Sequence, residues 1–115
     1  MRAARVDQRV VVAGTTATGP DGRLGGGADP HRQTVQALDN IAAALGDAGA
    51  LMGDVIRTRI YVTRREEAEP VMRALGAARH VRPAATLVLV SDLIDAAMLV
   101  EIEADAVVDL AESEP

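Results

Sequence analysis

Apolar residues recur along this chain with two different periods, and these periods predict its elements. The β-branched run over 9–14 predicts a strand, followed by a loop with a strong turn signal at 19–22 and a short return strand. Residues 56–62 alternate Ile, Thr, Ile and Val with Arg, Arg and Tyr, as expected of a strand with two unlike faces. The apolar run 84–90 and the alternating stretch 99–108 predict two further strands.

Two helices are predicted between these strands. Asp29 is placed as the N-cap of the first helix, Pro30 fits its first position, and the helix continues to about residue 48. Gly49 is placed to end it. A second helix has Pro70 in its first turn and ends near residue 78. The apolar stripe of the first helix is predicted to consist of Val35, Leu38, Ile41, Ala42 and Leu45.

The order of these elements predicts an α+β fold in which one mixed sheet is covered on one face by two helices. The chain has neither an internal repeat nor a long linker, so we expect a single domain over 1–108 and a disordered acidic tail over 109–115. The other face of the sheet needs a cover, and self-association would provide one.

Composition strengthens the expectation of self-association. Tyr61 is the only aromatic residue among 115, so Val, Leu, Ile and Ala must fill a small core. Cysteine is absent, which excludes disulfides, thiolate nucleophiles and zinc–sulfur sites. Lysine is also absent, which excludes Schiff-base chemistry at a lysine.

The net charge of −5 argues against nucleic acid as a partner, because binding phosphates requires clustered basic residues. No stretch approaches the roughly 18 consecutive apolar residues of a membrane span, and no signal peptide is evident. We therefore expect a cytoplasmic protein without a membrane partner.

Several side-chain groups could carry chemistry, but each has an ordinary structural alternative. The hydroxyl-rich loop 14–19 could bind a ligand or simply form a strand-to-loop turn, since no helix directly follows it. The acids Glu101, Glu103 and Asp105 share one strand face, which is usually solvated. His31 and His80 have no ligand spacing, and the glycines at 25–27 lack the dinucleotide-binding spacing, so neither a metal nor a cofactor is expected.

Eight short segments nevertheless occur in the order of one known family. The segments are Val12-Ala13-Gly14-Thr15-Thr16, Gly19-Pro20-Asp21-Gly22, 33–41 (QTVQALDNI), 48–51 (AGAL), 54–56 (DVI), 61–63 (YVT), Arg82-Pro83-Ala84-Ala85-Thr86 and 100–104 (VEIEA). With these segments the chain resembles, from about residue 9 to residue 107, the Rid family of reactive intermediate deaminases, also called the YjgF family.

The resemblance implies a chorismate-mutase-like fold that forms a homotrimer. Three sheets would close into a central barrel, and three small-molecule clefts would lie between the subunits. Deaminating members of the family hydrolyse 2-imino acids, or their enamine tautomers, to 2-keto acids and ammonia without a cofactor. An arginine in the cleft holds the substrate carboxylate while water attacks.

The chain departs from the deaminating pattern at that arginine. Where those members read Arg-Pro-Ala-Arg-Thr, this chain has Ala85 at the second arginine. A charge-assisted contact is worth roughly 1.5–3 kcal/mol, so its loss matters for a small anionic substrate. Arg82 matches the first arginine of the motif and is expected to point to the opposite face from Ala85, although it could hold an anion or lie at the surface.

The resemblance assigns roles to the remaining site residues. Glu101 matches a glutamate that acts as a cleft acid or positions water, so it is the candidate catalytic residue. Thr15 and Leu87 match positions near the cleft and join Arg82 and Ala85 as candidate substrate-binding residues.

Three functions stay open. The first is hydrolysis of an imine, an enamine or a related C–N bond by a route without the arginine, with Glu101 positioning water. The second is a noncatalytic trimer that binds a metabolite or a partner protein. The third, an endoribonuclease, is the least favoured because the chain is acidic and has one aromatic residue.

Overall fold

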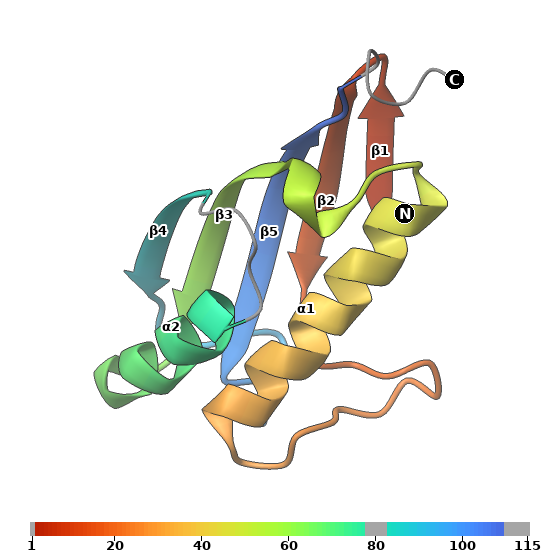
Figure 1. Cartoon of the computed structure of the whole chain (residues 1–115). Helices are drawn as coiled ribbons and strands as arrows, with labels where there is room; N and C mark the ends of the chain where they lie inside the picture. Colours follow the sequence, from red (N-terminus) through yellow and green to blue (C-terminus); the bar gives the residue numbers. More distant parts are fainter. Residues whose placement is uncertain (1, 78–82, 110–115) are drawn as a thin grey trace.

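The computed structural model describes residues 2–77 and 83–109, and these form one sheet and two α-helices (Figure 1). Strands β1 (Ala3–Val6) and β2 (Arg9–Thr15) come first, and a loop leads to α1 (Pro30–Asp47). The chain continues through β3 (Val55–Val62), α2 (Ala68–Ala77), β4 (Ala84–Leu89) and β5 (Val100–Val107). Short 3₁₀ turns, η1 (Met52–Asp54) and η2 (Arg65–Glu67), precede β3 and α2.

The sheet is mixed, and both helices lie on the same face of it (Figure 1). Its strand order is β1-β2-β5-β3-β4. Only β3 and β4 pair in parallel, with α2 as the crossover between them, and the other neighbours are antiparallel. The predicted α+β architecture with two helices on one face is confirmed.

The ends of α1 follow from local chemistry. The Asp29 side chain accepts hydrogen bonds from the backbone N–H groups of His31 (2.9 Å) and Arg32 (3.3 Å), as an N-cap does. After the helix, Gly49 takes φ +82°, and the Arg5 guanidinium donates to the carbonyl oxygen of Ala48 at 2.7 Å. A Cβ at residue 49 would lie 2.7 Å from this guanidinium, so Gly49 allows both the backbone turn and the arginine contact.

The buried face of α1 is rotated from the predicted stripe. Val35 is 42% exposed and Ala42 is also exposed, so their assignment to the core was wrong. Gln33 is fully buried instead, because its amide donates to the carbonyl oxygens of Gly27 (2.7 Å) and Ala97 (2.9 Å) and accepts from the N–H of Leu99 (2.9 Å). These bonds satisfy a buried polar side chain and fix the two loops beside the helix.

A bulge in β3 changes the predicted alternation of that strand. The pairing with β5 shifts register between Val55 and Arg57, which leaves Ile56 51% exposed and places Val55 in the core. From Thr58 to Val62 the predicted alternation holds. Between β2 and α1, the expected return strand is reduced to one isolated bridge between Thr18 and Leu24.

The N-terminal strand β1 was not predicted. It is only four residues long, mostly exposed, and pairs with β2 through a tight turn in which Asp7 takes φ +52°. In such an edge strand the pairing partner, rather than an apolar pattern, determines the structure. At the other end of the chain, Asp109 is described, and residues 110–115 of the expected tail lie outside the described residues.

The core lies between the helices and the three central strands. β2, β5 and β3 contribute alternate residues, all of them small or β-branched, and α1 and α2 cover them. The fully buried large side chains from these elements include Val10, Val12, Ile41, Leu45, Ile60, Val62, Val71, Leu75, Val100 and Ile102.

Replacing Gly26 should destabilise the protein more than replacing Gly22. Both glycines have φ near +80°, but a Cβ at Gly26 would lie 2.8 Å from the backbone nitrogen of Gln33, whereas nothing lies within 4 Å at Gly22. We expect Gly22→Ala to lower the free energy of unfolding by about 1–2 kcal/mol and Gly26→Ala by about 3 kcal/mol. Denaturant titration at one protein concentration measures both, and equal losses would show that the Gln33 contact imposes no constraint.

Candidate functional site

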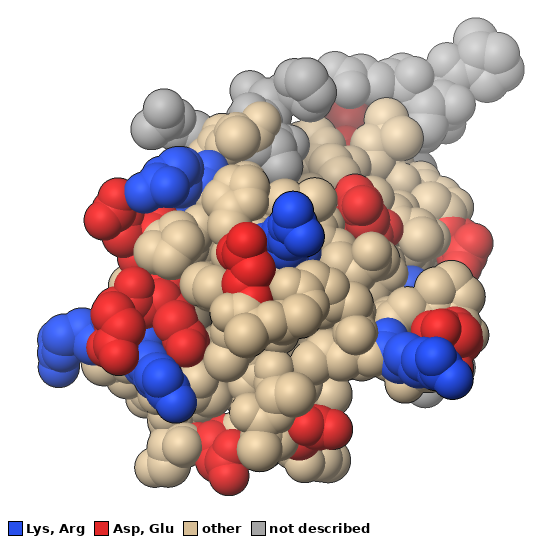
Figure 2. Space-filling model, turned by 90° about the horizontal axis from the view of Figure 1, so that it is seen from below, with Lys and Arg blue, Asp and Glu red and all other residues tan. Residues whose placement is uncertain are grey.

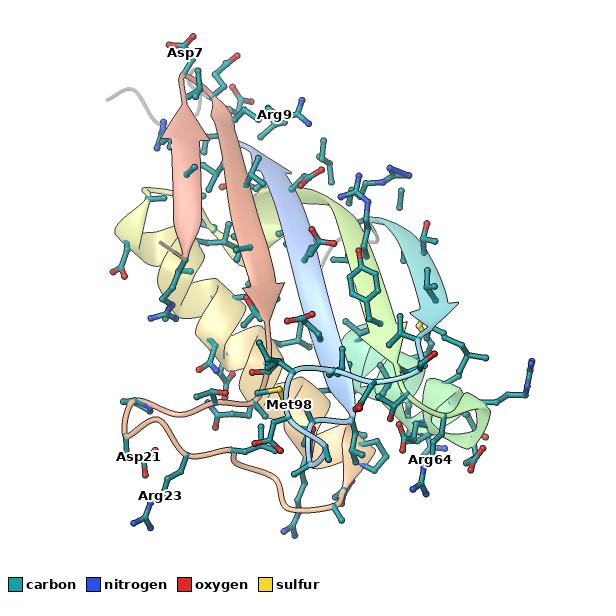
Figure 3. All side chains as sticks on the ribbon, turned by 180° about the vertical axis from the view of Figure 1, so that it is seen from behind. Asp7, Arg9, Asp21, Arg23, Arg64 and Met98 are labelled. Atoms are coloured by element: carbon teal, nitrogen blue, oxygen red, sulfur yellow. The ribbon has the colours of Figure 1, made fainter. Side chains whose placement is uncertain are left out.

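Glu101 lies on the sheet face that no described helix covers, which we call the open face. Figure 3 is turned toward this face of the sheet. It pairs directly with Tyr61 across β5 and β3, while its neighbours Val100 and Ile102 are fully buried on the helix side. Because successive residues of a strand point to opposite faces, Glu101 faces away from the core. Its side chain is half-buried.

A bulge in β2 makes room for the Glu101 carboxyl group. The pairing between β2 and β5 shifts register between Val12 and Thr15. At Gly14, inside this bulge, a Cβ would lie 3.0 Å from both Cδ and Oε1 of Glu101. The absence of a side chain at Gly14 therefore lets the carboxyl group lie against the β2 backbone.

The neighbouring acids of the open face have partners. The Tyr61 hydroxyl donates a short hydrogen bond to Glu103. Arg9 and Arg59 each place a guanidinium nitrogen 3.9 Å from Asp105. Within residues 2–77 and 83–109, no basic side chain forms an ion pair with Glu101 or Glu103. Glu101 thus has no ion-pair partner among the described residues.

This environment raises the pKa of Tyr61 above its ordinary value of 10.0. The main cause is the hydrogen bond to Glu103, which stabilises the protonated phenol. Burial and the negative charges of Glu103 and Glu101 raise the pKa further, and the positive charge of Arg59 opposes them.

Ala85 and Leu87 lie on the opposite face from Glu101. Across the parallel pair, Ala85 aligns with Thr58 and Leu87 with Ile60, both of which are buried on the helix side. Ala85 itself is exposed because β4 is the edge strand, whereas Leu87 packs partly against the core. The buried hydroxyl of Thr58 has no hydrogen-bond partner among the residues that the structure describes. Arg82 lies outside the described residues.

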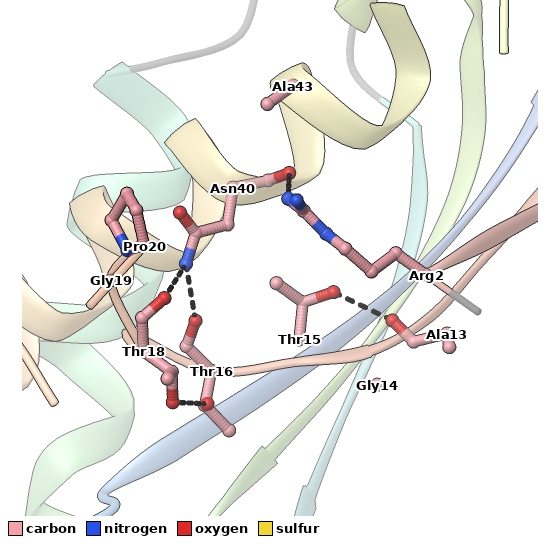
Figure 4. A pocket seen from close by; sticks show the side chains of 10 residues that line it. All are labelled: Arg2, Ala13, Gly14, Thr15, Thr16, Thr18, Gly19, Pro20, Asn40 and Ala43. Carbon is pink, nitrogen blue, oxygen red and sulfur yellow. Dashed lines mark hydrogen bonds between the residues drawn. The ribbon is translucent and has the colours of Figure 1, made fainter. Parts of the chain in front are cut away.

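Thr15 is the last residue of β2. It pairs with Ile102 and lines a cavity of about 520 Å³ between the end of β2, the loop after it and α1 (Figure 4). Asn40 of α1 closes one side of this cavity, and its amide donates to the carbonyl oxygens of Thr16 (3.0 Å) and Thr18 (2.8 Å). Gly14, against which Glu101 lies, lines the same cavity. Thr15 thus lies beside the Glu101 site, although it pairs with a residue of the helix side, whereas Ala85 lies apart on β4.

Three residues around these sites had no role assigned from sequence. Tyr61 is notable in the sequence as the one aromatic residue, and its alternation with the arginines of β3 is the signal that places it on their face. Asn40 falls within the family segment 33–41, which gives it no role. Arg2, which also lines the cavity, lies in a stretch where no element was predicted.

Among the described residues, no group of three or more His, Cys, Asp or Glu side chains is arranged to hold a metal ion. None of the described helices is both long and apolar enough to span a membrane. On the end of the molecule in Figure 2, acidic and basic side chains are interspersed, and no extended basic area is visible there.

These features define a class of protein: a small α+β protein with a one-sided mixed sheet and a polar open face. The family model Endoribonuclease L-PSP matches residues 1–108. A member of the YjgF/YER057c/UK114 family from Mycobacterium tuberculosis is 46% identical in sequence, with a TM-score of 0.83, covering 93% of this chain and 85% of that one.

Two further proteins are similar to this chain over most of its length. The YjgF gene product of E. coli is 27% identical, with a TM-score of 0.85, covering 93% of this chain and 86% of that chain. An uncharacterized protein of Streptomyces coelicolor is 38% identical over 106 residues, which are 91% of this chain and 78% of that protein. The chain belongs to the YjgF/UK114/RidA family, as its motifs predicted, and this membership supports a role in processing small molecules.

Titration of Tyr61 tests the geometry of the open face. Because the chain has no other tyrosine and no tryptophan, ultraviolet difference absorbance reports this phenol alone. We expect its pKa to lie above 10.0, to fall in Glu103→Gln and to rise further in Arg59→Gln, since these variants remove a negative and a positive neighbour respectively. An unchanged pKa in Glu103→Gln, with the fold verified by circular dichroism, would contradict the contact.

Proposed function

We propose that the chain forms a Rid-type homotrimer in which three sheets build a central barrel and small-molecule clefts lie between the subunits. The open face supports association, because it exposes the apolar side chains of Val11, Val88 and Val107, each at least 40% accessible. The strand pairing places these side chains beside polar and charged residues of neighbouring strands: Val11 pairs with Asp105, Val107 with Arg9 and Val88 with Tyr61. Such a mixed face resembles the surface of an interface more than that of a monomer.

The placement of the candidate site residues is the observation that carries the proposal. Glu101 lies on the open face, whereas Ala85 and Leu87 align with buried residues of the helix face, on the edge strand. Residues on opposite faces of one sheet cannot line one pocket within a single copy. They can do so where the edge strand of one copy meets the open face of the next. A cleft built from both sets is thus a cleft between subunits.

The proposed reaction is hydrolysis of an imine, an enamine or a related C–N bond. Glu101 accepts a hydrogen bond from a water molecule and draws its proton as the water oxygen attacks the C=N carbon. The nitrogen gains protons and leaves as ammonia or an amine, and a carbonyl compound remains. This route requires neither a cofactor nor a covalent intermediate. The Gly14 bulge holds the carboxyl group in place beside the β2 backbone.

Ala85 determines which substrates the cleft can hold. No positive group stands at this position, and two arginines of the open face, Arg9 and Arg59, are engaged by Asp105. We therefore expect weak retention of substrates that depend on a carboxylate–arginine contact. The same observation favours a second candidate function, a trimer that binds a metabolite or a partner protein without turnover. RNA cleavage is not favoured by the acidic charge and the single aromatic residue.

Hydrolysis of enzymatically generated 2-iminopropionate, followed by keto-acid and ammonia release, tests the proposal. We expect release above the spontaneous rate in the unmodified protein, loss of that excess in Glu101→Gln, and an increase of about tenfold or more in Ala85→Arg, which restores a charge-assisted contact. Ala84→Arg is the matched control, because Ala84 is also exposed on β4 but aligns with Arg57, on the other face.

The outcomes separate the candidates. Undiminished release in Glu101→Gln, or an equal gain in both arginine variants, would contradict the assignment of the cleft. Ligand-induced stabilisation of the trimer without any release would favour the noncatalytic binder.

A further inference from the structure

The one aromatic residue of the chain lies on the open face and not in the core. Tyr61 pairs directly with Glu101 on one side and with Val88 on the other, so these residues form one row across β5, β3 and β4. Beyond Glu101 lies Gly14, whose missing side chain makes room for the carboxyl group. Neighbouring strands of a sheet are about 5 Å apart. The row therefore places an aromatic and an aliphatic side chain beside the candidate catalytic carboxyl group.

The contact at its hydroxyl holds the Tyr61 side chain in place. The hydroxyl donates a hydrogen bond to Glu103, the next acid on the same face of β5. The Tyr61 side chain is half-buried, and Val88 is 40% exposed. A tyrosine ring offers a large apolar contact area at a low cost in conformational entropy. Tyr61 thus presents an apolar surface whose polar end already has a partner.

The row itself contains no basic residue. Ala85 stands where deaminating relatives would place an arginine, and Arg59 lies opposite Glu103, outside the row. Arg59 also has Asp105 within 3.9 Å. A hydrocarbon group bound over Glu101 therefore meets Tyr61 and Val88, whereas a carboxylate bound there meets no positive group of the row.

We propose that Tyr61 determines the substrate class of the Glu101 site: an imine or enamine without a carboxylate, held by a branched aliphatic or aromatic group against Tyr61 and Val88. This inference rests on the proposed function, because it requires the cleft over Glu101. Ala85 and Leu87, which the next copy contributes to that cleft, are also apolar. Burial of a group the size of a leucine side chain strengthens binding about tenfold or more. It can thereby replace the arginine contact that this chain lacks.

Four ketones test this preference, since each is the stable hydrolysis product of one imine. Acetone and 4-methyl-2-pentanone are neutral, whereas pyruvate and 4-methyl-2-oxopentanoate have a carboxylate in place of one methyl group. Binding to the full chain is followed by the backbone amide NMR signals of Gly14 and Glu101, after light scattering has verified the trimer. We expect 4-methyl-2-pentanone to bind about tenfold or more tightly than acetone. Neither carboxylate should bind more tightly than its neutral counterpart.

Variants separate the contact from general effects on the fold. Tyr61→Phe keeps the ring and should retain the preference, whereas Tyr61→Ala should weaken binding of 4-methyl-2-pentanone about tenfold and leave acetone unchanged. Val88→Ala should weaken it about threefold. Val107→Ala is the matched control and should change nothing, because Val107 is equally exposed, at 40%, but pairs with Arg9 at the far end of β5.

Three results would overturn the assignment. They are equal binding of the two neutral ketones, tighter binding of the carboxylates, which would show that a cation such as Arg59 holds the substrate, and equal losses in Val88→Ala and Val107→Ala. If Tyr61→Ala does not assemble, the two valine variants decide. The expected preference without any imine hydrolysis would support the ligand class and contradict only the proposed reaction. A monomer in solution would contradict both, because the cleft would not form.

Discussion

The alternation of side chains along β5 divides its residues between the two faces of the sheet. Val100, Ile102 and Ala104 point into the core, so Glu101 and Glu103 must point to the other face. Both helices cover the apolar side, and no described helix covers the acidic one. The core thereby determines where the candidate catalytic carboxylate lies. It also leaves a face on which Val11 and Val88 are exposed beside charged residues, and a second copy can bury that face.

The fold was largely predictable from sequence because its strong signals are local. Asp29 and Pro30 start α1 as a cap and a first-turn proline, and the alternation of β5 follows from period 2 alone. The errors arose where tertiary contacts override local pattern. Gln33 is buried because two distant loops satisfy its amide, and Ile56 is exposed because a bulge shifts its strand. No sequence period reports either event.

The candidate site was predictable only in part, for a different reason. Family motifs identify Glu101, Ala85 and Leu87 but not the sheet faces on which they lie, which depend on strand pairing. The cavity near Thr15 requires Arg2 and Asn40, which are 38 residues apart in sequence and meet only because β1 runs beside α1.

If identical subunits cover the open face, the protein in solution must have a molar mass well above that of one chain. Light scattering on the purified protein, over a range of concentrations, should give about three times the chain mass of 12.0 kDa. The mass should stay constant on dilution over the working range. A mass of a single chain at all concentrations would contradict the account, because Glu101 and the edge strand would then have no means of sharing a cleft.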